Sequence, residues 1–243
     1  HERDRLVPIG SAIRFIIEAC KGLDYAHNAV DVRQRPLNIV HRDISPPNLL
    51  VSVRGEVKVV DFGLAKAASQ LEVTDPGVVK GKFSYLSPEA ASGLQPDCRA
   101  DLFSVGILLY RLTVGELPFK GKNPHEVLKR IAEVDCIRPI IANPKVGDGL
   151  SKIIDRAMER NPEFRYGSVE ELLEALTEYL AANQVEDVKN ELDRREKFGL
   201  QRQTGRGARD EGLLNLTIPD KLAEAAREAG SFDAWRRRRR PRR

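Results

Sequence analysis

The chain has 243 residues, of which 41% are hydrophobic and 31% are charged, enough for one well-packed domain or a domain with a tail. Its longest largely apolar run, residues 103–110, is far shorter than the roughly 20 residues that span a bilayer, so we expect no membrane segment. Three scattered cysteines without metal-ligand spacing predict neither disulfides nor a zinc site, and a cytoplasmic location is expected.

The net charge of +4 is unevenly distributed. Seven arginines lie at the C-terminal end, after Trp235, so the remainder of the chain carries −3. The folded part therefore has no basic footprint for nucleic acid, and no specific nucleic-acid partner is expected. The arginine run could bind phosphate polymers non-specifically, or it could simply be a solvated tail, which is the commoner case.

Secondary structure is predicted from hydrophobic periodicity. Residues 7–29 carry apolar side chains at helical spacing, which predicts a buried amphipathic helix. Two β-rich runs, 49–53 and 57–60, flank a glycine-centred connection and predict a hairpin. After a long polar loop that extends to Glu89, helical patterns occupy residues 100–114, 124–133, 149–160 and 168–182.

Beyond about residue 183 the periodicity weakens. Residues 185–198 and 219–229 could form helices, but the polar stretch between them predicts a poorly ordered tail. The expected class is therefore α+β, mainly α, with one domain over residues 1–182 and a tail over residues 183–243.

Three short motifs follow one another in a fixed order. They are HRDISPPN at 41–48, DFG at 61–63 and SPE at 87–89. Protein kinases have signature motifs in this order, at about this spacing. The chain resembles the C-terminal lobe of a eukaryotic-type serine/threonine protein kinase of the bacterial, myxobacteria-like kind. The resemblance covers about residues 1–182 and implies a helical bundle whose short hairpin carries the catalytic loop and the DFG motif.

The resemblance implies transfer of the ATP γ-phosphate to serine or threonine hydroxyls of protein substrates, with ATP and Mg²⁺ as cofactors. Such a reaction is catalysed mainly by positioning and charge neutralisation. Asp43 matches the carboxylate that orients the attacking hydroxyl, and Asn48 and Asp61 match the magnesium ligands. Leu50 matches the residue that packs beneath the adenine.

Supporting roles also carry over by position. His41 and Phe62 match an apolar stack beneath the site, next to Gly63 of the DFG motif. Asp101 matches the carboxylate that holds the catalytic-loop backbone. Glu89 and Arg165 match a buried ion pair of the family.

Arg42, which precedes Asp43, is typical of kinases that are switched by phosphorylation of the activation segment. Thr74 is the first candidate acceptor, with Ser69 and Ser84 as alternatives. A plain solvated loop residue is an equally good interpretation of Thr74.

The chain departs from the family pattern in the catalytic loop. A lysine is usual two residues after the aspartate, where this chain has Ser45, and Lys82 occupies a position that is usually threonine. Those positions face one another in the family fold. We therefore hypothesise a swapped pair, in which Lys82 supplies the charge; the alternative is a solvent-directed Lys82 and an impaired site.

The second departure is that no glycine-rich loop or lysine-bearing strand precedes the catalytic loop in this chain. We expect the chain to be a fragment without its N-terminal lobe, and to be inactive in isolation. The alternative function is a non-catalytic, kinase-like lobe that acts as a binding scaffold.

Overall fold

The computed structural model describes residues 7–51, 57–62 and 83–183. Helix α1 (Ile9–His27) buries a stripe of apolar residues that includes Ile13, Ile16 and Leu23. Their i, i+3, i+10 spacing places them on one side of the helix. The amphipathic helix that the sequence predicts over residues 7–29 therefore forms, slightly shorter at each end.

The hairpin packs against α1. Strands β1 (Leu49–Val51) and β2 (Val57–Val59) pair antiparallel, with Leu49 opposite Val59, and the short 3-10 turn η2 (Pro46–Asn48) leads into β1. At Gly22 of α1 a Cβ atom would lie only 3.2 Å from Val59 Cγ2, so the glycine allows this close approach. The predicted hairpin is confirmed over the residues that the structure describes.

Helix α4 (Arg99–Val114) is the centre of the lobe, because 14 of its 16 residues are buried. Burial on all sides explains why the helix is apolar around its whole circumference. It packs against α1 and against α7 (Gly147–Ala157). It ends at Gly115, whose φ of 94° suits glycine in a left-handed C-cap.

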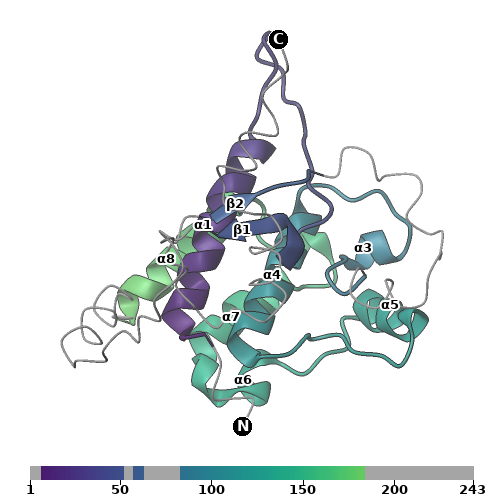
Figure 1. The fold of residues 1–243 in the computed structure, drawn as a ribbon, viewed down its shortest axis with the longest axis vertical. Coiled ribbons are helices and arrows are strands. Elements are labelled where there is room, and N and C mark those ends of the chain that lie inside the picture. The colour runs from purple at the N-terminus through teal and green to yellow at the C-terminus, as the bar shows by residue number, and fades with distance from the viewer. Residues whose placement is uncertain (1–6, 52–56, 63–82, 184–243) are drawn as a thin grey trace, which may run out of the picture.

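The other elements surround this centre (Figure 1). Helix α8 (Val169–Ala182) lies alongside α1, whereas α3 (Pro88–Ala91) and α5 (Pro124–Glu133) pair at the opposite side of the lobe. Helix α6 (Pro139–Ala142) and the turns η3 (Pro144–Val146) and η4 (Pro162–Phe164) complete the connections.

Most helix starts follow from local chemistry. Ser87, Asn123 and Ser168 each cap a helix by accepting a backbone N–H, and proline follows directly in α3 and α5. One prediction was wrong in its limits: the helix expected over residues 149–160 ends at Ala157. The residues that follow turn instead into η4 at Pro162, which cannot continue a helix.

The polar insert before the catalytic loop forms a small projection rather than an irregular loop. An antiparallel bridge joins Val30 to Pro36, and Asp31 accepts hydrogen bonds from the backbone N–H groups of Arg33 and Arg35. The projection extends beyond the C-terminal end of α1 (Figure 1). None of the helices in the described part of the chain could cross a membrane. The mainly helical class with one short hairpin is confirmed.

Candidate active site

The backbone of the catalytic loop is held by one buried carboxylate. Asp101, in the first turn of α4, is 0% exposed. Its Oδ2 accepts the backbone N–H of His41 and its Oδ1 that of Arg42, both at 2.8 Å. Arg42 adopts a φ of 65°, which costs energy for a residue with a side chain. The two charge-assisted bonds stabilise this turn of the loop.

A third donor completes the coordination of Asp101. The His27 Nε2, at the end of α1, lies 2.8 Å from Asp101 Oδ2. Sequence reasoning missed His27, because it is 74 residues from its partner and no motif marks the pair. The buried carboxylate thus joins α1, α4 and the catalytic loop.

The ring of His41 connects the loop to the DFG strand. Its Nδ1 accepts the N–H of Asp43 at 3.2 Å, which leaves the proton on Nε2 to donate to the carbonyl of Val60 at 3.0 Å. The ring also lies 4.5 Å from that of Phe62, tilted by 53°. His41 is fully buried. Its two hydrogen bonds and its contact with Phe62 therefore fix how Asp43 lies relative to Asp61, which follows Val60.

Asn48 is fixed by a similar pair of bonds. Its side-chain Nδ2 donates to the backbone carbonyl of Asp43 at 2.7 Å, and its backbone carbonyl accepts the N–H of Val60 at 2.9 Å. The amide oxygen is therefore turned away from the Asp43 carbonyl. Asp61 follows directly after Val60, is exposed, and has a φ of 58°. The oxygen donors of Asn48 and Asp61 are thus carried by backbone segments that are hydrogen-bonded to each other.

These oxygen donors fit magnesium. Mg²⁺ takes hard oxygen ligands, keeps several waters and binds through only one or two protein groups together with phosphates. Within the described residues no group of three histidine, cysteine or acidic side chains could hold a metal by itself. The pair of oxygen donors on Asn48 and Asp61 matches the one or two protein groups that such an ion takes.

Of the remaining predicted site residues, the structure describes Ser45 and Leu50. Ser45 directs its Oγ to the carbonyl of Asp43 at 3.4 Å, a long bond within its own loop. Leu50 is half-buried on β1. Lys82, Gly63 and Thr74 lie outside the residues that the structure describes.

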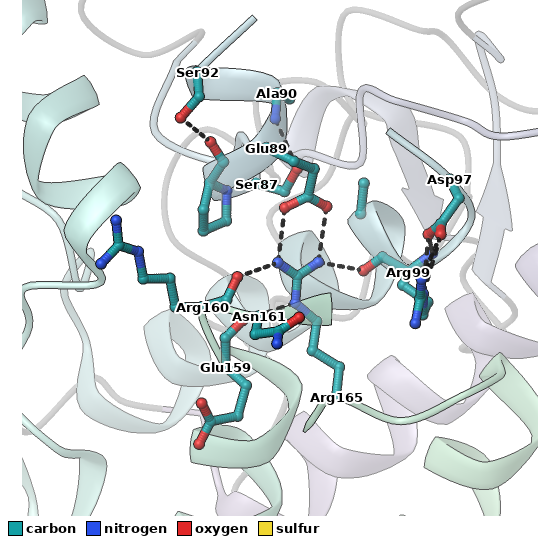
Figure 2. A network of polar contacts seen from close by, with 12 residues as sticks. Ser87, Glu89, Ala90, Ser92, Asp97, Arg99, Glu159, Arg160, Asn161 and Arg165 are labelled. Atoms are coloured by element: carbon teal, nitrogen blue, oxygen red, sulfur yellow. Dashed lines mark hydrogen bonds and ion pairs between the residues drawn. The ribbon is translucent and has the colours of Figure 1, made fainter. Parts of the chain in front are cut away.

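Glu89 and Arg165 form the buried ion pair at the other end of the site (Figure 2). The guanidinium donates to both carboxylate oxygens, at 2.8 and 2.7 Å, in a fork arrangement. The side chain of Arg165 is 0% exposed and that of Glu89 is 12% exposed.

All five N–H donors of Arg165 have partners. Besides Glu89, they bond the backbone carbonyls of Glu159, Arg160 and Arg99. Figure 2 shows these bonds converging on one guanidinium from α3, from the start of α4 and from the segment that precedes η4. Arg165 therefore ties three separate segments together, and none of its N–H groups lacks an acceptor.

Between these two ends lies the segment of residues 83–88. Ser104 of α4 donates its hydroxyl to the carbonyl of Tyr85 at 2.6 Å, and Arg111 donates through Nη1 to the Tyr85 hydroxyl. Sequence reasoning did not single out Ser104, Tyr85 or Arg111. Ser104 and Arg111 lie three and ten residues after Asp101 on α4. This spacing becomes meaningful only once their common partner, Tyr85, is known.

Comparison with known proteins agrees with this geometry. Residues 2–177 match the protein kinase domain family, which covers well over half of the chain. The chain therefore belongs to the protein kinase family, and its resemblance to a bacterial kinase of eukaryotic type is confirmed.

Individual relatives are bacterial and eukaryotic. The chain is 41% identical over 175 residues to the tyrosine-protein kinase MasK of Myxococcus xanthus, covering 72% of this chain and 27% of that protein. It is 35% identical over 170 residues to the serine/threonine-protein kinase PknB of Mycobacterium leprae, covering 70% and 26%. The twitchin kinase region from C. elegans superposes with a TM-score of 0.56 at 27% identity, covering 70% of this chain and 28% of that one. The chain spans about a quarter of the length of these curated relatives.

The Glu89–Arg165 pair predicts a specific dependence of stability on pH. Burial acts to raise the pKa of Glu89, but hydrogen bonding and the charge of Arg165 outweigh it, so the net pKa is lowered. Such a carboxylate contributes fully to the stability of the fold above the pKa that it has in the unfolded chain, about 4.3. This contribution is lost as pH falls through its lower pKa in the folded state. We expect Glu89→Gln to reduce the free energy of unfolding by about 3 kcal/mol at neutral pH, with a difference that shrinks below about pH 4.

Denaturant titrations of wild type and variant between neutral and acidic pH measure this difference. Glu163→Gln is the matched control, because Glu163 pairs with Arg99 in solvent at 70% side-chain exposure and should cost less than about 1 kcal/mol. A Glu89→Gln difference that is constant across the whole pH range would contradict the prediction.

The third donor to Asp101 gives a second prediction. His27→Leu should destabilise the protein by about 1–3 kcal/mol, because one oxygen of a buried carboxylate loses a donor. His27→Gln retains an N–H group at similar reach and should recover most of the loss. Chemical denaturation measures both variants, with His125→Leu at an exposed site on α5 as the control. Equal losses for the leucine and glutamine variants would show that the hydrogen bond is not what matters.

Proposed function

We propose that this chain forms the C-terminal lobe of a catalytic domain that transfers the γ-phosphate of ATP to serine or threonine hydroxyls of proteins. The observation that carries the proposal is the hydrogen-bonded unit of His41, Asp43, Asn48 and Val60. It brings a carboxylate and two further side-chain oxygen donors onto adjoining segments in a member of the kinase family.

In this proposal each residue has a limited role. The carboxylate of Asp43 accepts a hydrogen bond from the acceptor hydroxyl and orients it for in-line attack. Asn48 and Asp61 hold Mg²⁺, which supplies charge neutralisation on the phosphates. The tight backbone around Asp43 supports catalysis because it removes the need to reorganise the loop during the reaction. Leu50 would lie beneath the adenine.

Serine and threonine are the proposed acceptors. Several relatives at 34–36% identity carry serine/threonine-kinase names, whereas MasK is named as a tyrosine kinase. The alanine or arginine that tyrosine kinases place after the catalytic aspartate is absent from HRDISPPN. Phosphoamino-acid analysis of the products would separate the two classes.

Arg42 supports a regulatory element in the proposal. Its Nε is buried and has no hydrogen-bond partner in the described part of the chain. A phosphate on the activation segment would provide a doubly charged acceptor for such a guanidinium. Thr74 is the proposed phosphorylated residue; of the alternatives, Ser84 is only 3% exposed and so is poorly accessible.

The activity is proposed for the full-length protein, in which an N-terminal lobe would cover the nucleotide. In that protein Asp43→Asn should reduce kcat for phosphorylation of a generic protein substrate by about 10²- to 10⁴-fold, because an oriented acid–base group is lost. A radiometric assay with Mg-ATP measures the rate. Asp148→Asn, at an exposed ion pair with Lys152, is the control. An inactive wild-type protein that still binds partners would instead support the scaffold alternative.

The swapped pair of Ser45 and Lys82 is a separate prediction. If Lys82 supplies the charge that the catalytic loop lacks, Ser45→Lys plus Lys82→Thr should retain activity, whereas each single variant should lose it. The two sites would then show a coupling of about 0.5–3 kcal/mol in transition-state stabilisation. A double-mutant cycle on kcat/KM in the full-length protein measures this coupling, and purely additive losses would refute the swap.

A further inference from the structure

The projection between α1 and the catalytic loop exposes apolar side chains to solvent. It consists of residues 28–40, of which residues 32–38 are all exposed. Three large apolar side chains lie on it: Val32 is 99% exposed, Leu37 50% and Val30 44%. Exposed apolar residues that are scattered singly over a surface need no explanation. Here three of them occur within residues 30–37, so the projection is a candidate interaction surface.

Internal hydrogen bonds fold the projection into a ribbon. The backbone N–H of Leu37 donates to the carbonyl of Ala29, and that of Asp31 donates to the carbonyl of Arg35, both at 2.9 Å. The Asp31 carboxylate also pairs with the Arg35 guanidinium at 2.7 Å. A two-stranded ribbon is only marginally stable in water by itself. A surface packed against this one would stabilise both its backbone and its apolar side chains.

Both ends of the projection are anchored on the same atom. His27, which directly precedes it, places Nε2 2.8 Å from Asp101 Oδ2, and the backbone N–H of His41, which directly follows it, donates to that oxygen at 2.8 Å. The other oxygen of this carboxylate accepts the backbone N–H of Arg42. Anything that packs on the projection therefore also restrains the carboxylate that holds the catalytic loop.

The projection leaves the lobe beside the proposed nucleotide site. Strand β2 packs against α1 at Gly22, in the last two turns of the helix, where a Cβ atom would lie 3.2 Å from Val59. The exposed Asp61 follows this strand. Figure 1 shows the hairpin beside the half of α1 from which the projection extends. A lobe that closes over Asp61 and Leu50 would therefore meet the projection.

The chemistry of the projection suits a protein surface. The charges of Asp31 and Arg35 satisfy each other, and Arg33 is the only other charged residue of this segment. The rest of the exposed ribbon is mainly apolar or uncharged. Valine and leucine side chains gain free energy by leaving water for an apolar surface, which a nucleotide or a polyanion does not offer. The partner expected at this position is the N-terminal lobe of the full-length protein.

We infer that the projection is a docking site for that N-terminal lobe, with Val30, Val32 and Leu37 packed against the lobe when it closes over the nucleotide. The inference rests on the proposed function, which places the lobe above the site. It adds a link between closure and the catalytic loop, because the projection and the loop share Asp101. Docking thus favours the loop conformation that positions Asp43.

Cysteine labelling of the full-length protein with Mg-ADP present tests whether the projection is covered. Val32→Cys should react with a maleimide about tenfold more slowly than Ile141→Cys, each rate being divided by that of the same variant unfolded in urea. Without a covering lobe residue 32 should react at least as fast, since Val32 is 99% exposed and Ile141, on α6, is 68% exposed. Tandem mass spectrometry separates the new cysteine from Cys20, Cys98 and Cys136. Equal or faster labelling at residue 32 would overturn the inference.

Photo-cross-linking identifies what covers the projection. The full-length protein with benzoylphenylalanine in place of Val32 should form cross-links within one molecule, to the N-terminal lobe that precedes residue 1. Cross-links to residues 184–243, or between two molecules, would assign the surface to a different occupant and overturn the inference. The absence of any cross-link would show a solvated projection and would overturn it as well.

The kinetics of the full-length protein separate the inference from the proposed function. Val32→Asp should raise KM for Mg-ATP about tenfold, because a charge on the docking surface opposes closure. The side chain of Val32 is exposed in this lobe, so the substitution should not disturb the fold of the lobe itself. Ile141→Asp, at an exposed apolar residue on α6, is the control and should leave KM unchanged.

Phosphate transfer with a KM that Val32→Asp does not change would overturn the inference and leave the proposed function standing. No transfer to any protein substrate in Mg-ATP would overturn the proposed function. Labelling and cross-linking would then still decide whether the projection is covered, because neither measurement requires catalysis.

Discussion

The burial of one carboxylate at the start of α4 is the constraint on which the rest of the site depends. An ionised group in the interior is costly unless hydrogen bonds replace its water. Asp101 obtains three donors, two from the catalytic-loop backbone and one from His27. The requirement to satisfy this charge forces the loop into one conformation, including the left-handed turn at Arg42. The geometry of Asp43 and Asn48 follows from that conformation.

Helix α4 extends the same organisation over the lobe. Along its length it contacts the catalytic loop through Asp101, the segment before α3 through Ser104 and Arg111, and the late helices through the carbonyl of Arg99, which accepts from Arg165. Because the helix is buried on all sides, it is a rigid reference for these contacts. The catalytic loop and the segment before α3 are therefore positioned by one element.

Several parts of this arrangement could be predicted from local signals. The apolar periodicity of residues 7–29 and the glycine between two β-rich runs predict α1 and the hairpin, because these elements bury one face and leave the other in solvent. The helix after Gly147 was predicted to end three residues too late, since helix ends depend on capping and on the next turn. The short helices α3 and α6 were not predicted, because four residues are too few to show a period.

By itself, the sequence determined the family and supplied the residue types that the proposed phosphoryl transfer would use, because motif order and chemistry are properties of the chain. Only the tertiary structure decided which groups support them. His27 meets Asp101 across 74 residues, and Arg111 meets Tyr85 across 26. Neither pair has a local signature, because a contact between distant residues is set by how helices pack and not by spacing along the chain. An arginine whose partner is a phenol looks the same in sequence as one whose partner is a carboxylate, and only the packing around α4 distinguishes Arg111 from Arg165.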